Sequence, residues 1–320
     1  MDSGTAMARD WETTIREWSR APTEDETRKM ERAESRIREA IADDTKLRTH
    51  DVKVYRQGSY YNRTNVPAES DVDIRVEVRD VLFPDFYLVD KEAPFNPEIR
   101  ARLEAEARLS DSSYTYQEFK DDVGVALVRK FGPPPAVERG DKAYDIHETR
   151  YQVESDCLAA FRHIRYTRDI YGRIVTSAEG IEFISDKGIR ILNFPDQQHA
   201  NGERKHDATN QRFRKQVRVM KNLRNEMHDT GRPEAKPIIS FLTECLVYNV
   251  PNEVFRYATF YDRTREVIRW LYLNTETDEQ VHEWGEESEL KYLFRDNQPW
   301  TREQVHDFLL DAWVYVGFTN

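Results

Sequence analysis

The chain has 320 residues, and 48 Lys and Arg against 59 Asp and Glu give it a formal net charge of −11. This acidic balance excludes a protein that coats duplex nucleic acid through its net charge, although a local basic patch stays possible. Hydrophobic residues make up 38% of the chain and aromatic residues 12%, so we expect a folded core despite 33% charged residues.

The two cysteines, Cys157 and Cys245, are too few for a disulfide framework or a four-ligand zinc site. The first ten residues lack the basic and then apolar run of a signal peptide. The most apolar stretch, 238–250, is short and contains Glu244, so we do not expect it to span a membrane. A reduced cytoplasmic protein is therefore expected.

The N-terminal third predicts two helices and then the first strands. Between about Met7 and Asp43, apolar anchors recur among Glu, Arg and Ala, and Pro22 and Thr23 break the run. A short strand and a glycine turn follow. Residues 71–78 then alternate polar and apolar side chains, which is typical of a strand with one buried face.

Residues 84–113 have little periodicity, whereas the rest of the chain separates into strands and then helices. A helix is predicted over 114–130, strands near 136–139, 143–148, 151–160, 180–185 and 190–194, and helices over 203–230, 236–249, 253–274 and 300–316. We therefore expect a mixed sheet lobe followed by a helical lobe, with the ligand site in a cleft between them.

The most informative motif is Gly58-Ser59 followed by Asp71-Val72-Asp73. Residues two apart in a strand point to the same side, so Asp71 and Asp73 present paired carboxylates that a divalent cation would neutralise. Gly58 favours a tight turn, and Ser59 can begin a helix whose free N–H groups face a phosphate. A lone Asp-x-Asp is usually a solvated edge; here the attached strand and Gly-Ser turn favour two-metal phosphoryl or nucleotidyl transfer.

Such a site usually needs a third carboxylate from a neighbouring strand. Asp145, Asp156 and Asp186 all lie in strand-like segments. Asp156 is favoured because its flanks are apolar, so its charge needs a partner. The residues alone leave the three alternatives open.

Gly58-Ser59-Tyr60-Tyr61-Asn62-Arg63-Thr64-Asn65 with Ser70-Asp71-Val72-Asp73-Ile74 resembles the active-site motif of cGAS/DncV-like nucleotidyltransferases, bacterial enzymes that make cyclic oligonucleotide signals in anti-phage defence. The resemblance continues through Asp156, Asn193-Phe194-Pro195, Met220-Lys221-Asn222 and the segment 240–251, which points to clade E. It implies an α+β fold: a polymerase-β-like palm, a mixed sheet with flanking helices, over 1–200, and a helical C-terminal lobe over 201–320.

The resemblance also implies roles for individual residues. Asp71, Asp73 and Asp156 would bind two Mg²⁺ ions, with Mn²⁺ as a possible substitute, and an Asn at the place of Asn193 is associated with the choice of uridine. The implied nucleotide-binding residues are Gly58, Ser59, Asn193, Lys221, Ser240 and Phe241. Cys157 stands where a small aliphatic residue is usual, and we interpret it as a buried packing thiol.

A basic stretch follows from Glu203 to Asn225. Arg214, Arg218 and Lys221 are spaced by four and three residues, so they share one face of the predicted helix and could converge on a polyphosphate. The alternative, a solvated helix face, applies to most of the basic residues in this stretch.

The expected activity is a Mg²⁺-dependent nucleotidyltransferase that joins two NTPs, UTP and a second one, with release of pyrophosphate. The product would contain a pyrimidine, as cyclic UMP-AMP or cyclic di-UMP, and would act on a downstream effector. A monomer that binds neither membranes nor nucleic acid in general is expected. The alternatives are an enzyme that makes linear oligonucleotides or extends RNA ends, and a nucleotide-binding regulator without catalysis.

Overall fold

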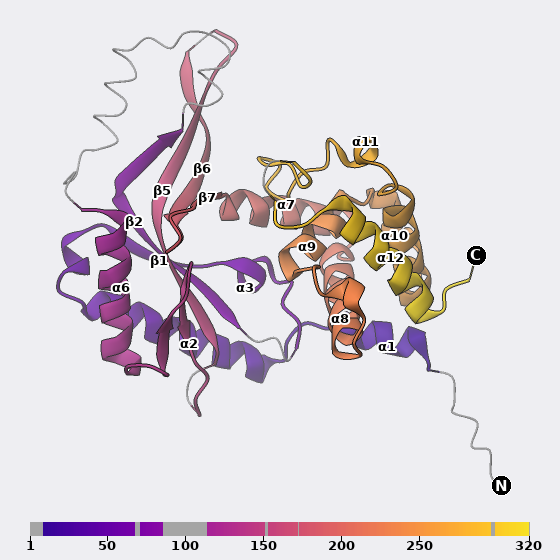
Figure 1. Ribbon diagram of the computed structural model, residues 1–320, viewed down its shortest axis with the longest axis horizontal. Coiled ribbons are helices and arrows are strands. Elements are labelled where there is room, and N and C mark those ends of the chain that lie inside the picture. Colours follow the sequence, from indigo (N-terminus) through magenta and orange to yellow (C-terminus); the bar gives the residue numbers. More distant parts are fainter. Residues whose placement is uncertain are drawn as a thin grey trace. The chain divides into compact units, whose positions relative to one another are not determined.

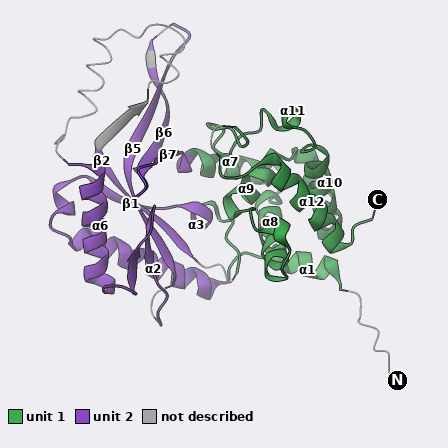
Figure 2. Cartoon of the chain, in the orientation of Figure 1, with its two compact units in different colours: residues 1–22, 62–69, 197–320 green, residues 23–61, 70–196 purple. Residues whose placement is uncertain are grey.

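The computed structural model describes residues 9–67, 71–85, 114–150, 153–171, 173–295 and 298–319. The chain forms two compact units (Figure 2). The sheet unit comprises residues 23–61 and 70–196, and the helical unit comprises residues 1–22, 62–69 and 197–320. Most of 84–113, where the sequence has no clear periodicity, lies outside the described residues.

The sheet unit is built on a mixed sheet that has seven strands in the described part of the chain (Figure 1). Its order is β1-β2-β5-β4-β3, and β6 pairs with β5 and β7. The strands are β1 (Val52–Arg56), β2 (Val72–Asp85), β3 (Val137–Arg139), β4 (Tyr144–Ile146), β5 (Ser155–Arg168), β6 (Ile174–Ile184) and β7 (Arg190–Asn193). β2 and β5 run parallel, whereas the other pairs are antiparallel, so the predicted mixed sheet is confirmed.

The alternation in the sequence of β2 separates a core face from a polar face. Its buried apolar residues, Val72, Ile74, Val76 and Val78, belong to one core with helices α2 (Glu24–Asp43) and α6 (Tyr116–Phe131). Both helices begin at a threonine with a reciprocal capping box, which explains why they start at Thr23 and Thr115. The carboxylate of Asp73 lies on the other, polar face of β2.

The helical unit has a separate apolar core. Its helices are α1 (Trp11–Trp18), α8 (Phe213–Asp229), α9 (Ser240–Asn249), α10 (Phe260–Leu273), α11 (Asp278–Val281), α12 (Arg302–Val316) and all but the first two residues of α7 (Pro195–Ala208). The N-terminal helix α1 packs on α8 and α10, so it belongs to this unit and not to the sheet. The predicted break at Pro22 therefore separates helices that pack on different cores.

Two predicted helices are wrong in their lengths. Instead of a continuous helix over 203–230, the chain forms α7 and α8, because Asn210 and Gln211 adopt left-handed backbone conformations with φ of 53° and 62°. The prediction for 253–274 was also too long: α10 begins at Phe260, where the side chain of Thr259 accepts a hydrogen bond from the Asp262 N–H. The helical spacing of apolar residues in a sequence does not reveal such local breaks in the backbone.

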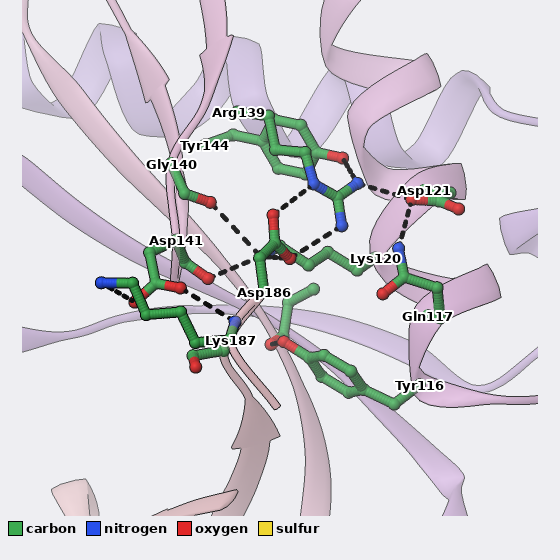
Figure 3. A network of polar contacts seen from close by, with 12 residues as sticks. Tyr116, Gln117, Lys120, Asp121, Arg139, Gly140, Asp141, Tyr144, Asp186 and Lys187 are labelled. Atoms are coloured by element: carbon green, nitrogen blue, oxygen red, sulfur yellow. Dashed lines mark hydrogen bonds and ion pairs between the residues drawn. The ribbon is translucent and has the colours of Figure 1, made fainter. Parts of the chain in front are cut away.

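An ion-pair network anchors α6 to the sheet and accounts for Asp186 (Figure 3). The ammonium of Lys120, a fully buried residue of α6, donates to Asp186 Oδ1 over 2.7 Å and to the Asp141 carbonyl over 3.0 Å. Arg139 on β3 donates to both oxygens of Asp186 over 2.7 and 2.9 Å. Asp186 thus neutralises structural cations, and the contacts give no support to it as the third metal ligand.

We predict that Asp186→Asn lowers the free energy of unfolding by roughly 1–3 kcal/mol at neutral pH, because it weakens charge-assisted bonds to a buried ammonium. Hydrogen bonds from Arg139 and then Lys120 hold the pKa of Asp186 well below its usual range. A carboxyl with a lowered pKa stabilises the fold above its unfolded pKa of about 4, and this contribution is lost as the pH falls.

Urea titrations of wild type and variant at several pH values check this prediction. The difference should shrink as the pH falls below about 4. The control Asp141→Asn, whose carboxylate lies 3.7 Å from Lys187, should cost less than about 0.5 kcal/mol. Equal stability of Asp186→Asn and wild type at neutral pH would contradict the assignment.

Candidate active site

Three carboxylates stand in one row across neighbouring strands of the sheet unit. In the register of the parallel pair, Asp73 on β2 lies opposite Asp156 on β5. In the antiparallel pair on the other side of β5, Asp156 lies opposite Asp145 on β4. Because paired residues point to the same face of a sheet, all three carboxylates occupy the polar face of β2. The register therefore brings Asp156 to the Asp-x-Asp motif.

The glycine turn approaches Asp73 closely. Gly58 begins α3 (Gly58–Asn62) in a left-handed conformation with φ of 58°. A Cβ atom at this position would lie 2.1 Å from Asp73 Oδ2, so no other residue fits without displacing the carboxylate. This contact explains why a glycine precedes Ser59, and it places the first turn of α3 beside the carboxylates.

The surroundings of Asp156 disfavour its negative charge. Although the residue reaches the solvent, partial removal from water and the neighbouring carboxylates of Asp145 and Asp71 raise the pKa of its carboxyl to about 6. Asp145 also shares a side-chain hydrogen bond with Asp156. Like charges so close together are unfavourable unless a proton or a cation is present.

The donor set suits a hard divalent cation. Carboxylate oxygens from Asp71, Asp73 and Asp156 are the ligands that Mg²⁺ prefers, and Gly58 leaves no side chain of its own in the way. Across the described ranges, no group of three potential ligands is already arranged around a common ion position. The three residues thus fit the ion by their chemistry, and Asp73 and Asp156 also by their common face.

Asn193 shares the carboxylate face of the sheet. It pairs with Ile181, which itself pairs with Arg162 on β5, six residues after Asp156 and therefore on the same side. The backbone of β7 comes so near β6 that a Cβ atom on Gly180 would lie 2.5 Å from the Asn193 carbonyl oxygen. This contact fixes the backbone at Asn193, whose side chain is half-buried.

A buried arginine links these parts of the site, and the sequence reasoning missed it. Arg75 follows Asp73 by two residues and is 3% exposed. Its guanidinium lies 3.1 Å from Glu77 and 3.2 Å from Asp196, and Asp196 also bonds the side chain of Tyr61 on α3. Arg75 thereby ties β2 to α3 and to the start of α7, just beyond Asn193. The feature of the sequence that could have revealed Arg75 is its position as a charged residue on the polar face of a predicted strand.

The other predicted nucleotide contacts lie in the helical unit. The Ser240 hydroxyl, at the first residue of α9, accepts a hydrogen bond of 2.7 Å from Arg224. Phe241 is half-buried, with its ring 6.1 Å from that of Trp300. The ammonium of Lys221 is buried and lies 3.3 Å from the carboxylate of Glu244. A triphosphate would have to compete with this carboxylate for the ammonium. The three residues stay predictions as nucleotide contacts.

The cations of α8 do not form an open anion-binding face. Arg214 pairs with Glu203, and Arg218 donates to the carbonyls of Ser19 and Arg63 over 2.9 and 2.8 Å. Both guanidinium groups are nearly buried. The interpretation that Arg214 and Arg218 converge with Lys221 on a polyphosphate is therefore not supported, because these cations satisfy groups inside the unit.

The cysteines behave as expected. Cys157 and Cys245 are free and fully buried. Burial raises the pKa of the Cys157 thiol to about 12, which makes it unreactive near neutral pH. Its interpretation as a packing thiol is confirmed. In the described part of the chain, no helix combines the length and apolar character that crossing a bilayer requires.

Comparison with known proteins decides the family. Residues 200–317 match the model of the cGAS/DncV-like nucleotidyltransferase C-terminal helical domain. The chain is 39% identical over 310 residues to the cyclic dipyrimidine nucleotide synthase CdnE of Legionella pneumophila, covering 97% of this chain and 99% of that protein. The chain belongs to the CdnE cyclic nucleotide synthases. The predicted family and the nucleotidyltransferase class are thereby confirmed.

Other members show the range of the family and confirm the fold. A cyclic dipurine nucleotide synthase of Elizabethkingia meningoseptica is 30% identical over 94% of this chain and 96% of its own length. The structure of the Rhodothermus marinus CdnE c-UMP-AMP synthase with Apcpp and Upnpp matches with a TM-score of 0.78 and 26% identity, covering 97% of both chains. The predicted α+β nucleotidyltransferase fold with a helical C-terminal lobe agrees with these matches.

The carboxylate row leads to a prediction on stability. A carboxyl whose pKa is higher in the folded protein stabilises the fold when protonated, and this contribution is lost as the pH rises through about 6. In EDTA at pH 8, Asp156→Asn should therefore be more stable than wild type by roughly 0.2–1 kcal/mol, the range for like charges on facing strands.

Thermal unfolding with and without millimolar Mg²⁺ measures this effect. Mg²⁺ should raise the Tm of wild type and of the control Asp141→Asn, and raise that of Asp156→Asn less. The same Mg²⁺ response in Asp156→Asn as in wild type would remove Asp156 from the ligand set.

Proposed function

We propose that the chain joins two NTPs into a cyclic dinucleotide with release of two pyrophosphates, and that the product contains a pyrimidine. The observation that carries the proposal is the shared sheet face of Asp73, Asp156 and Asn193. Two relatives, 39% and 38% identical over nearly the whole chain, are cyclic dipyrimidine nucleotide synthases. Their similarity favours a pyrimidine over the purines that some more distant members use.

In the proposed mechanism, Asp71, Asp73 and Asp156 would hold two Mg²⁺ ions, for which Mn²⁺ could substitute. The bound cations would lower the pKa of the attacking ribose hydroxyl and neutralise charge on the leaving pyrophosphate. Ser59 and the backbone of the Gly58 turn contact the triphosphate and orient its α-phosphorus. The ribose hydroxyl loses its proton to water, its oxygen forms the new bond to that phosphorus, and the bond to pyrophosphate breaks. The same step with the second triphosphate closes the ring.

Asn193 is proposed to select the base. Its amide offers one donor and one acceptor group, which match the imide edge of uracil. The ion pair of Arg75 with Asp196, three residues after Asn193, ties this part of the chain to β2. One such contact is worth about 1–3 kcal/mol, enough to bias the choice of base without dictating it.

The wider setting is also proposed. A cytoplasmic monomer would release its product to an effector in anti-phage defence, in keeping with the family. An enzyme that makes linear oligonucleotides is the second candidate, since it would use the same carboxylates; resistance of the product to phosphatase separates the two. Lys221, Ser240 and Phe241 remain proposed contacts to the triphosphate and the base.

We predict that Asp73→Asn lowers turnover by about 10³-fold, because it removes a metal ligand worth several kcal/mol in the transition state. Asp145→Asn makes the same chemical change in the same row but outside the proposed ligand set, so most activity should remain. Labelled NTPs and Mg²⁺ with separation of the products measure both. Full activity of Asp73→Asn, or loss confined to Asp145→Asn, would contradict the ligand assignment.

Base choice is tested at position 193. In a mixture of all four NTPs, Asn193→Ser should reduce the incorporation of UTP relative to ATP and GTP by about 10-fold, equivalent to one lost contact of roughly 1.4 kcal/mol. Mass spectrometry of the cyclic products gives the ratio within one reaction, so a general loss of activity does not affect it. An unchanged product profile would exclude Asn193 from base selection.

A further inference from the structure

A cluster of buried polar side chains lies inside the helical unit, separate from the carboxylate face. At its centre is Glu244 of α9, which is 2% exposed. Its Oε1 accepts from the Asn62 amide over 2.9 Å, and its Oε2 accepts from the Thr64 hydroxyl over 2.8 Å. The Lys221 ammonium lies 3.3 Å from Glu244 Oε2 and donates to Thr64 Oγ1 over 3.3 Å. All four residues are at least nine-tenths buried.

A second buried glutamate completes the cluster. Glu287 is 1% exposed and shares a side-chain hydrogen bond with Glu244. A Cβ atom on Gly202 of α7 would lie 2.3 Å from Glu287 Oε1, which explains why a glycine stands at this position of the helix. Burial, and then the charge of Glu244, raise the pKa of Glu287 well above its usual range. A raised pKa favours the protonated carboxyl of Glu287, which would supply the proton of the hydrogen bond shared with Glu244, while the Lys221 ammonium lies 3.3 Å from Glu244 Oε2 on its other side.

The bonds of this cluster converge on three consecutive residues, 62–64. Asn62 and Thr64 donate to Glu244, and the carbonyl of Arg63 between them accepts from Arg218 over 2.8 Å. Arg63 has a left-handed backbone with φ of 57°, which turns the chain sharply there. Asn62 is the last residue of α3, the helix that begins at Gly58 and Ser59. The cluster therefore fixes the chain directly after the predicted triphosphate contact.

We propose that Glu244 is a positioning residue: with Lys221 and Glu287 it holds residues 62–64, and through the short helix α3 it orients Ser59 toward the nucleotide phosphates. The proposal rests on the proposed function, because it assigns a purpose to the geometry of Ser59. It gives the two buried glutamates opposite roles. Glu244 is the acceptor on which the hydrogen bonds from Asn62 and Thr64 converge, whereas Glu287 is assigned the part of a donor to Glu244.

The same substitution at the two positions separates these roles. Glu287→Gln replaces a neutral acid by an amide that still donates to Glu244, so Tm and kcat/KM should stay near wild type. Glu244→Gln leaves the buried Lys221 without its counter-charge and keeps only one of the two acceptor oxygens that Asn62 and Thr64 use. It should lower Tm by roughly 5 °C or more and kcat/KM for UTP by about 10- to 100-fold, measured well below both unfolding midpoints.

A milder pair of variants covers the case in which Glu244→Gln does not fold. Thr64→Val keeps the shape and removes the hydroxyl that bonds Glu244, whereas Thr64→Ser keeps the hydroxyl and removes only a methyl group. Thr64→Val should raise the KM for UTP by about 10-fold and reduce the rise in Tm that UTP with Mg²⁺ produces. Thr64→Ser should restore both values.

The outcomes distinguish this inference from the proposed function. No cyclic product from wild type with any pair of NTPs would overturn the proposed function alone, because UTP-induced stabilisation can still be compared between variants. The inference is overturned if folded Glu244→Gln or Thr64→Val binds and turns over UTP like wild type. It is also overturned if Glu287→Gln is as damaging as Glu244→Gln.

Discussion

Mutual repulsion of carboxylates on adjacent strands is the constraint on which the sheet unit depends. Asp73 and Asp156 face each other across the parallel pair, with Asp145 next to them, and only a rigid backbone can hold them there without a cation. That rigidity comes from the opposite face of β2, whose valines and isoleucine pack against α2 and α6. Apolar burial on one face thus stabilises an unfavourable arrangement of charge on the other.

Each of the two units contains a buried lysine that pairs with a carboxylate. In the sheet unit the Lys120 ammonium meets Asp186, and in the helical unit the Lys221 ammonium meets Glu244. Each lysine is nearly or fully buried and also bonds a second oxygen of the protein. Such pairs contribute less to net stability than to defining one arrangement of neighbouring elements, because a shifted element would leave a buried charge unpaired. The net negative charge of the whole chain does not reveal these buried pairs of opposite charge.

The sequence predicted what depends on local pattern and failed where partners are distant. Period-two alternation located β2, and capping threonines agree with the starts of α2 and α6. The pairing of Asp156 rather than Asp186 with Asp73 depends on strand register, which joins residues more than eighty positions apart. Lys221 was predicted to face a polyphosphate because helical spacing does not reveal that the carboxylate of Glu244 lies 3.3 Å from its ammonium. Glu244 itself was visible as a charge within the most apolar stretch.

The close approach of Gly180 to the backbone of Asn193 bears on how this family changes its products. The glycine fixes the carbonyl at position 193 and leaves the side chain there unconstrained by that contact. Replacement of one side chain can therefore alter hydrogen-bonding preference without moving a strand. Under the proposed role of Asn193, single substitutions at this position would change the product while the sheet that carries the carboxylates stays as it is. We expect position 180 to tolerate far less variation than position 193.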